Sequence, residues 1–159
     1  MIFLTVGTQF PFDRLVRVVD EALGLKSFSE EVFGQIGESS YKPHNFEAVK
    51  HLEKKQYDRI FQEAAGIISH AGMGTITMAL KQQKPILVLP RRKMYGEVVN
   101  DHQLEIARRF ASLKHLLMAE EPEELAEKLN ILTDFKPNTR ETQVQAVQER
   151  ICQFLQTLP

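Results

Sequence analysis

The sequence predicts an α/β fold, a single Rossmann-like domain in which one parallel sheet of about six strands is flanked by helices. Short apolar runs alternate along the chain with segments whose apolar residues recur every three or four positions. These are the patterns of buried strands and amphipathic helices. Most strand-like runs are apolar throughout, as in parallel strands that are buried on both faces. The 159 residues suffice for one such domain with a sizeable core.

The first half of the chain predicts four strands and two helices. Residues 2–6 are a continuous apolar run, and Gly7 begins the turn that ends this strand. Pro11 and Asp13 suit the start of a helix, which Gly24 ends. The other elements predicted here are strands at 31–36, 46–52 and 66–69 and a helix at 53–65.

The second half continues the alternation, interrupted by an irregular loop at 90–100. A last helix within 137–159 carries apolar residues at steps of three and four, so it can pack on the sheet or form a homodimer. The other predicted elements are helices at 75–83, at 101–111 and from 121 onward, and strands at 85–89 and 114–118.

Composition argues against several classes of protein. The formal net charge is −1, so no overall basic field indicates nucleic acid binding. Cys152 is the only cysteine, and the histidines are scattered, so we expect no disulfide and no metal site. No run approaches the ~20 apolar residues of a membrane span, so a membrane role would need a partner or a surface patch.

The turn after the strand at 66–69 is the first candidate binding site. Gly72 and Gly74 let backbone N–H groups approach a ligand, and the following helix presents its positive end to a phosphate. Thr75 adds a hydroxyl. A tight turn without a ligand is equally consistent with these residues. His70 could orient a phosphate, act as an acid or base, or hydrogen-bond within the turn.

Gly7, Thr8 and Gln9 form a second candidate turn at the same sheet edge. The Gly72-x-Gly74 spacing is an incomplete dinucleotide fingerprint, which follows the fourth strand rather than the first. No acidic residue ends the next strand, which argues against NAD. Arg91 and Arg92 stand there instead, so NADP stays open.

The loop at 90–100 and the helix after it offer further polar groups. Arg91, Arg92 and Lys93 could meet a diphosphate, anionic lipid headgroups or only solvent. Glu97 could be a base, a hydroxyl acceptor or a solvated charge. The helix opens with Asp101-His102-Gln103, in which Asp101 suits an N-cap and the Gln103 amide suits sugar hydroxyls.

Three segments together resemble the C-terminal domain of glycosyltransferase family 28: residues 68–75, 84–90 and 100–103. Residues 3–8 and the length of the chain are similar to those of one subgroup of this family. That subgroup holds the stand-alone donor-binding subunits of split glycosyltransferases. These include the eukaryotic subunit that adds the second N-acetylglucosamine to a dolichol-diphosphate-linked sugar. The loop at 91–97 is more similar to the bacterial exopolysaccharide and capsule branch.

This resemblance implies half of a two-domain GT-B enzyme. The present half would bind a UDP-sugar, and a membrane-anchored partner would bind the lipid-linked saccharide acceptor. The implied reaction is inverting transfer of a hexose or uronic acid, without a metal or other cofactor. The chain would be cytoplasmic and recruited by its partner to the inner face of the cell membrane.

The resemblance also assigns residues to the donor. The turns at Gly7 and His70 would meet the diphosphate from two sides, and the helix start at 101 would read the sugar. His70 is the candidate catalytic residue, although relatives are expected to carry the base in the other half. The candidate substrate-binding residues are Gly7, Thr8, Gln9, His70, Gly72, Gly74, Thr75, Arg91, Glu97, Asp101, His102 and Gln103.

One position departs from the family pattern. Met78 stands where related sequences tend to carry an acidic residue that holds the ribose hydroxyls. Methionine cannot accept those hydrogen bonds. This departure favours a second hypothesis, a non-catalytic subunit that only activates or stabilises another transferase. A third hypothesis is a free-standing NADP-dependent oxidoreductase.

Overall fold

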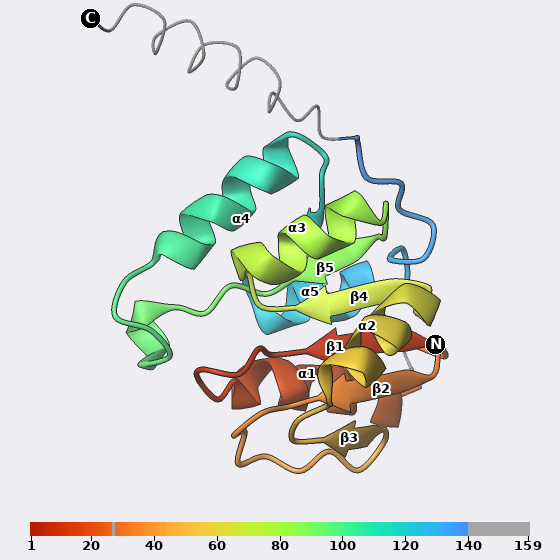
Figure 1. Cartoon of the computed structure of the whole chain (residues 1–159). Coiled ribbons are helices and arrows are strands. Elements are labelled where there is room, and N and C mark those ends of the chain that lie inside the picture. The colour runs from red at the N-terminus through yellow and green to blue at the C-terminus, as the bar shows by residue number, and fades with distance from the viewer. Residues whose placement is uncertain (27, 140–159) are drawn as a thin grey trace, which may run out of the picture.

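A computed structural model describes residues 1–26 and 28–139 (Figure 1). Its sheet has six strands in the order β3-β2-β1-β4-β5-β6, and every neighbouring pair is parallel. The α/β fold predicted from the sequence is therefore confirmed. The strands are β1 (Ile2–Thr5), β2 (Val32–Gln35), β3 (Glu47–Val49), β4 (Gly66–Ser69), β5 (Ile86–Val88) and β6 (Leu117–Met118).

The helices fill the connections between these strands. The predicted helix at 75–83 begins earlier, at Met73, because Gly72 takes the extended conformation of an N-cap residue. The helix predicted within 137–159, and with it the homodimer through its apolar face, falls almost wholly outside the described residues. The helices are α1 (Asp13–Gly24), α2 (Lys54–Glu63), α3 (Met73–Lys81), α4 (His102–Ser112) and α5 (Pro122–Leu129), with a 3-10 helix η1 (Lys93–Tyr95).

Alternate residues of the strands build two cores, one on each face of the sheet. Ile2 and Leu4 of β1 pack on the face covered by α1 and α5. Phe3, between them, packs on the face covered by α2, α3 and α4. All three side chains have no exposed surface, which explains why the strand reads as apolar throughout.

The order of the strands reverses between β1 and β4. The chain proceeds from β1 outward to β2 and β3, then returns to β4 on the other side of β1 and proceeds to β5 and β6. The loops that follow β1 and β4 therefore lead to opposite faces of the sheet. In open α/β sheets, such a switch point leaves a crevice at the carboxyl ends of the strands.

Asp20 of α1 ties the loop between β2 and β3 to the domain. Its side chain is only 2% exposed and accepts hydrogen bonds from the Tyr41 hydroxyl (2.7 Å) and from the backbone N–H groups of His44 (2.9 Å) and Asn45 (2.7 Å). Burial raises the pKa of Asp20, but these hydrogen bonds outweigh it and hold the pKa below its ordinary value.

We expect Asp20→Asn to lower the free energy of unfolding by about 2 kcal/mol, because an amide nitrogen would face donors that now bond to a carboxylate. The cost should be present at neutral pH and shrink in acid, where the wild-type carboxylate is itself protonated. Urea unfolding of both proteins measures it. Glu21→Gln, at an exposed neighbouring position, is the control. Equal stability of Asp20→Asn and wild type would contradict this account.

Candidate functional site

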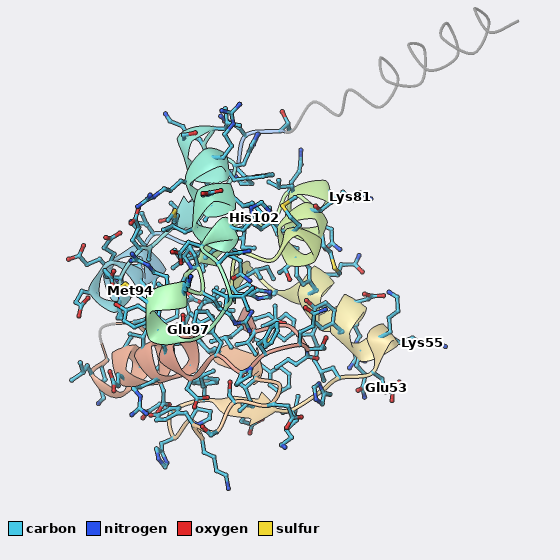
Figure 2. All side chains as sticks on the ribbon, turned by 90° about the vertical axis from the view of Figure 1, so that its left-hand side faces the viewer. Glu53, Lys55, Lys81, Met94, Glu97 and His102 are labelled. Atoms are coloured by element: carbon cyan, nitrogen blue, oxygen red, sulfur yellow. The ribbon has the colours of Figure 1, made fainter. Side chains whose placement is uncertain are left out.

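A cavity of about 270 Å³ lies at the carboxyl edge of the sheet, at the switch point between β1 and β4. Figure 2 looks onto this edge, where Met94, Glu97 and His102 mark the loop after β5 and the start of α4. Three loops, which follow β1, β4 and β5, meet there. The residues that line the cavity are Val6, Gly7, Thr8, Gln9, Phe10, His70, Gly72, Gly74, Thr75, Arg91 and Gln103.

All but three of the candidate substrate-binding residues predicted from the sequence line this cavity. The exceptions are Glu97, Asp101 and His102. Val6 and Phe10, which were not singled out, flank the turn at 7–9, so their nearness to it in the sequence was the available signal.

The imidazole of His70 packs against both glycine turns. A Cβ atom added to Gly7 would lie 2.9 Å from His70 Cε1, and one added to Gly72 would collide with His70 Nε2. Gly7 also has a φ of +75°, which favours glycine. Gly74 has open space where a side chain would stand. Gly7 and Gly72 are therefore required by the histidine itself, and Gly74 is the glycine that leaves backbone open to a ligand.

His70 is neutral at physiological pH. Burial and the nearby Arg91 charge lower its pKa from 6.5 to about 4, against a smaller opposing effect of a hydrogen bond to the backbone of Thr5. The Ser69 hydroxyl donates to the Thr5 carbonyl (2.6 Å), so its oxygen accepts from His70 Nδ1 (3.2 Å). The unprotonated nitrogen is then Nε2. A pKa this low makes His70 a weak general base at neutral pH.

Arg91 places a buried positive charge in the cavity wall. The residue is 2% exposed, and its Nη2 donates to the carbonyls of Val6 and Phe10, both at 2.7 Å. Its guanidinium also lies 4.9 Å from the centre of the Phe12 ring. Burial lowers the pKa of Arg91 to about 10, partly offset by Glu97, so the group is charged at neutral pH.

The amino end of α3 adds a second source of positive potential. No side chain caps this helix, and its first turn contains no acidic residue, so the N–H groups near Gly74 and Thr75 are left for a ligand. Gln103 faces the same cavity. Its Oε1 accepts from the Arg91 N–H (3.2 Å), which leaves the amide NH₂ as a donor. Together these groups suit an anion with hydroxyl or phosphate oxygens nearby.

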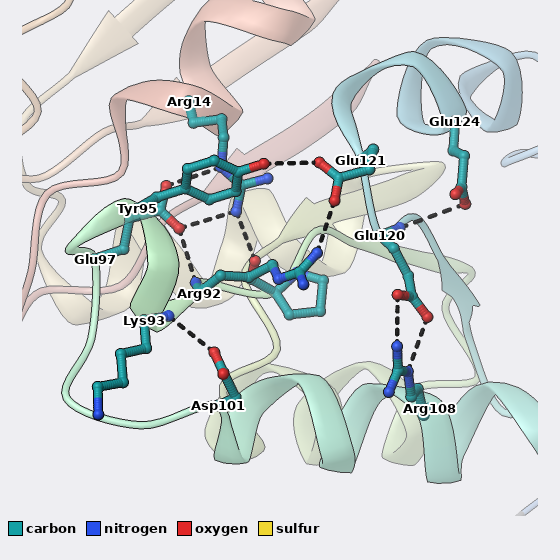
Figure 3. Close-up of polar contacts among 11 residues, drawn as sticks. Arg14, Arg92, Lys93, Tyr95, Glu97, Asp101, Arg108, Glu120, Glu121 and Glu124 are labelled. Carbon is teal, nitrogen blue, oxygen red and sulfur yellow. Dashed lines mark hydrogen bonds and ion pairs between the residues drawn. The ribbon is translucent and has the colours of Figure 1, made fainter.

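Two of the three exceptions, Glu97 and Asp101, bind groups of the loop at 90–101 instead (Figure 3). Glu97 is neither a free base nor a solvated charge, because its carboxylate binds Arg14 at 2.9 Å through both oxygens. Asp101 accepts from the Lys93 N–H (2.8 Å) rather than capping α4, and Asn100 accepts from the His102 N–H instead (3.2 Å). The His102 side chain is 68% exposed.

A neighbouring cavity of about 420 Å³ runs along α3 and shares Gly74 with the first. Met78 lines it and packs partly into the core beneath. Thr77 belongs to the incomplete dinucleotide fingerprint with Gly72 and Gly74, whereas Lys81 was not singled out in the sequence, although it lies within one helical turn of Met78. The lining residues are Met73, Gly74, Thr77, Met78 and Lys81.

Three other expectations, on an NADP phosphate, a metal ion and a membrane span, can be compared with the structure. A pair of arginines for an NADP phosphate is not available, because Arg92 pairs with Glu121 at 2.7 Å and Arg91 is buried. Within residues 1–26 and 28–139, no three His, Cys, Asp or Glu side chains gather to hold a metal ion. No helix in this part of the chain is long and apolar enough to cross a membrane.

The depressed pKa of His70 predicts a pH dependence of stability. Between about pH 6.5 and pH 4 the unfolded chain binds a proton at His70 that the folded chain does not, so the free energy of unfolding falls as the pH falls. We expect His70→Gln to remove about 2 kcal/mol of this dependence, as measured by urea unfolding from pH 7 to pH 4. His102→Gln, at an exposed site, should keep it. A His70→Gln profile parallel to that of wild type would contradict the assignment.

Comparisons with known proteins show what this chain is similar to. The chain is 47% identical over 53 residues to the UDP-N-acetylglucosamine transferase subunit ALG13 of Eremothecium gossypii, covering 33% of this chain and 24% of that protein. It is 30% identical over 124 residues to the human subunit of that name, and the match covers 72% of this chain and 10% of the human protein. The chain thus spans less than two thirds of the length of these relatives.

The fold matches that of solved glycosyltransferases. Acinetobacter baumannii MurG superposes with a TM-score of 0.62 at 20% identity, covering 98% of this chain and 49% of that one. The model of the glycosyltransferase family 28 C-terminal domain matches residues 1–157. The chain is therefore a member of the glycosyltransferase family 28 C-terminal domain family.

Proposed function

We propose that this chain is the donor-binding subunit of an inverting glycosyltransferase that uses a UDP-sugar. The observation that carries the proposal is the cavity at the switch point. It combines the uncapped amino end of α3, the buried Arg91 charge and the open backbone at Gly74, and no carboxylate is among its lining residues. These groups suit the diphosphate of a nucleotide sugar.

The two neighbouring cavities suggest how such a donor would lie. The diphosphate would sit between Gly7 and the first turn of α3, beside Arg91. The nucleoside would extend along α3 into the cavity at Met78, since the two cavities share Gly74. The sugar would then lie near the Gln103 amide, with its hydroxyl groups within reach of that donor.

In the reaction, an acceptor hydroxyl oxygen forms a bond to the anomeric carbon of the sugar while the bond to the UDP oxygen breaks. Negative charge grows on the diphosphate as it leaves. The α3 amino end and Arg91 are already fixed, so they stabilise this charge without reorganising and without a metal. The unprotonated Nε2 of the neutral His70 would accept a hydrogen bond from a hydroxyl group of the donor, and a base supplied by the partner would take the proton of the acceptor hydroxyl.

Family membership supports a transferase domain of this kind. The relatives are named as subunits of a UDP-N-acetylglucosamine transferase. We propose that a membrane-anchored partner binds a lipid-diphosphate-linked saccharide at the inner face of the membrane and that this chain is recruited there from the cytoplasm. The loop at 91–97 is more similar in sequence to the bacterial branch. We therefore propose transfer of a hexose or uronic acid in exopolysaccharide or capsule synthesis.

A second candidate is a non-catalytic subunit that stabilises or activates a separate transferase. Met78 favours it, because the cavity along α3 offers no carboxylate for ribose hydroxyls among its lining residues. Calorimetric titration with UDP, with and without the partner, separates the two. Binding in either case supports the donor-binding subunit, and no binding in both supports the alternative.

We expect His70→Ala and Gln103→Ala each to lower transfer by the reconstituted pair about tenfold to a hundredfold, because each removes a polar group from the cavity wall. Sugar transfer from the UDP-sugar to a lipid-linked acceptor measures it, with circular dichroism to check the fold. His102→Ala is the matched control, since this exposed histidine does not line the cavity. Full transfer in both cavity variants would refute these roles.

Met78→Glu should strengthen UDP binding about tenfold, because a carboxylate in this cavity could accept hydrogen bonds from the ribose hydroxyls. Calorimetric titration of the isolated chain measures the change. Met94→Glu serves as the control, since Met94 is exposed on η1 and does not line the cavity. Unchanged or weaker binding in Met78→Glu would exclude the ribose from this position.

A further inference from the structure

The backbone on both sides of Arg91 is held by the same pair of side chains. The carbonyl of Pro90, before it, accepts a hydrogen bond from Arg14 Nη2 at 2.8 Å. The N–H of Arg92, after it, donates to Glu97 Oε2 at 2.8 Å. Both contacts are drawn in Figure 3. The chain is therefore fixed immediately before and immediately after the buried cation.

Arg14 and Glu97 also bind each other in a shielded position. Arg14 Nε and Nη2 donate to the two carboxylate oxygens of Glu97, each at 2.9 Å, which is the two-pronged geometry of a strong charge-assisted pair. Their side chains are only 15% and 12% exposed. The Tyr95 ring covers the Arg14 guanidinium at 4.6 Å, so water is largely kept from it.

We propose that Arg14 and Glu97 are positioning residues, which fix the backbone around Arg91 and so hold this cation in the cavity wall. The proposal rests on the proposed function to the extent that Arg91 faces a diphosphate. In this proposal, neither Arg14 nor Glu97 touches the ligand. Arg14 does not line the cavity of about 270 Å³, and both carboxylate oxygens of Glu97 are already bound.

The far side of the same loop is anchored separately. Arg92 Nη1 and the Tyr95 hydroxyl bind the two oxygens of Glu121, which precedes α5, at 2.7 and 3.0 Å. Glu121 is therefore a second anchor, on the other side of the loop from α1. The Arg14–Glu97 pair differs from it in binding the peptide groups next to Arg91 directly, which gives it the closer control over that side chain.

Simple removal of one partner cannot by itself test this role. Arg14→Ala would leave the Glu97 charge largely buried and without its ion-pair partner, which lowers stability for reasons unrelated to Arg91. The exchange variant R14E/E97R restores an ion pair. However, a glutamate at position 14 cannot donate to the Pro90 carbonyl, and an arginine at position 97 cannot accept from the Arg92 N–H. The backbone contacts around Arg91 are then lost together with the stacking of Arg14 on Tyr95, while an ion pair is kept.

UDP titration and urea unfolding of the full chain test the proposal together. We expect Arg14→Ala and Glu97→Gln to weaken UDP binding at least tenfold. The exchange variant should regain most of the lost unfolding midpoint and yet still bind UDP at least tenfold more weakly than wild type. Recovery of UDP affinity in the exchange variant, or wild-type affinity in Arg14→Ala, would overturn the proposal, because an ion pair alone would then suffice.

Arg108 and Glu120 provide a matched control. They form another two-pronged pair, at 2.8 and 2.7 Å, which is more exposed and lies away from the cavity. R108E/E120R should bind UDP as wild type does. Loss of UDP binding in this control would overturn the proposal, since exchanging any such pair would then be disruptive.

Hydrogen exchange separates this proposal from the proposed function. If wild type fails to bind UDP both alone and with its partner, the proposed function is wrong. The positioning role is then decided by amide exchange of the peptide at 90–97 without ligand. We expect exchange at least tenfold faster in R14E/E97R than in wild type or R108E/E120R, because the Arg92 N–H loses its acceptor. Unchanged exchange would overturn the positioning role.

Discussion

The parallel pairing of β1 with β4 is the constraint on which the site depends. It places the turns that follow these strands side by side at one edge of the sheet, although residues 7 and 70 are far apart in the sequence. His70 then fills the space between Gly7 and Gly72, where any larger residue would collide with its ring. The position of the cavity is therefore set by the order of the strands, and its polar groups act within that frame.

The electrostatic potential of the site depends on which charged side chains line the cavity and which lie outside it. Arg91 lies in the cavity wall and is held by backbone carbonyls, whereas Glu97 lies outside the cavity and binds Arg14. This separation leaves a cavity wall with one buried cation, one helix amino end and one neutral histidine. A carboxylate within the cavity would cancel that field. The geometry thus matches an anionic ligand more closely than the formal net charge of −1 would indicate.

The sequence was informative where local patterns decide the structure. Apolar runs predicted the strands, and β4 lies at the residues expected for it. The glycine turns at 7 and 72 indicated where the cavity lies. The reason for those glycines was only partly foreseen, because the contact with His70 joins separate segments. Glu97 and Asp101 could not be placed, since their partners, Arg14 and the Lys93 N–H, depend on how an irregular loop packs. Arg14 itself carries no local signal of its role.

The span of the contact between Arg14 and Glu97 has a consequence for how the protein is made. These residues are 83 positions apart, and Arg91 reaches back 85 positions to the Val6 carbonyl. Closing such distant contacts costs chain entropy and requires β1, β4 and β5 to be in register first. The cavity is therefore completed only after the chain has been synthesised past Gln103. The cavity thus exists only when both halves of the sheet have joined.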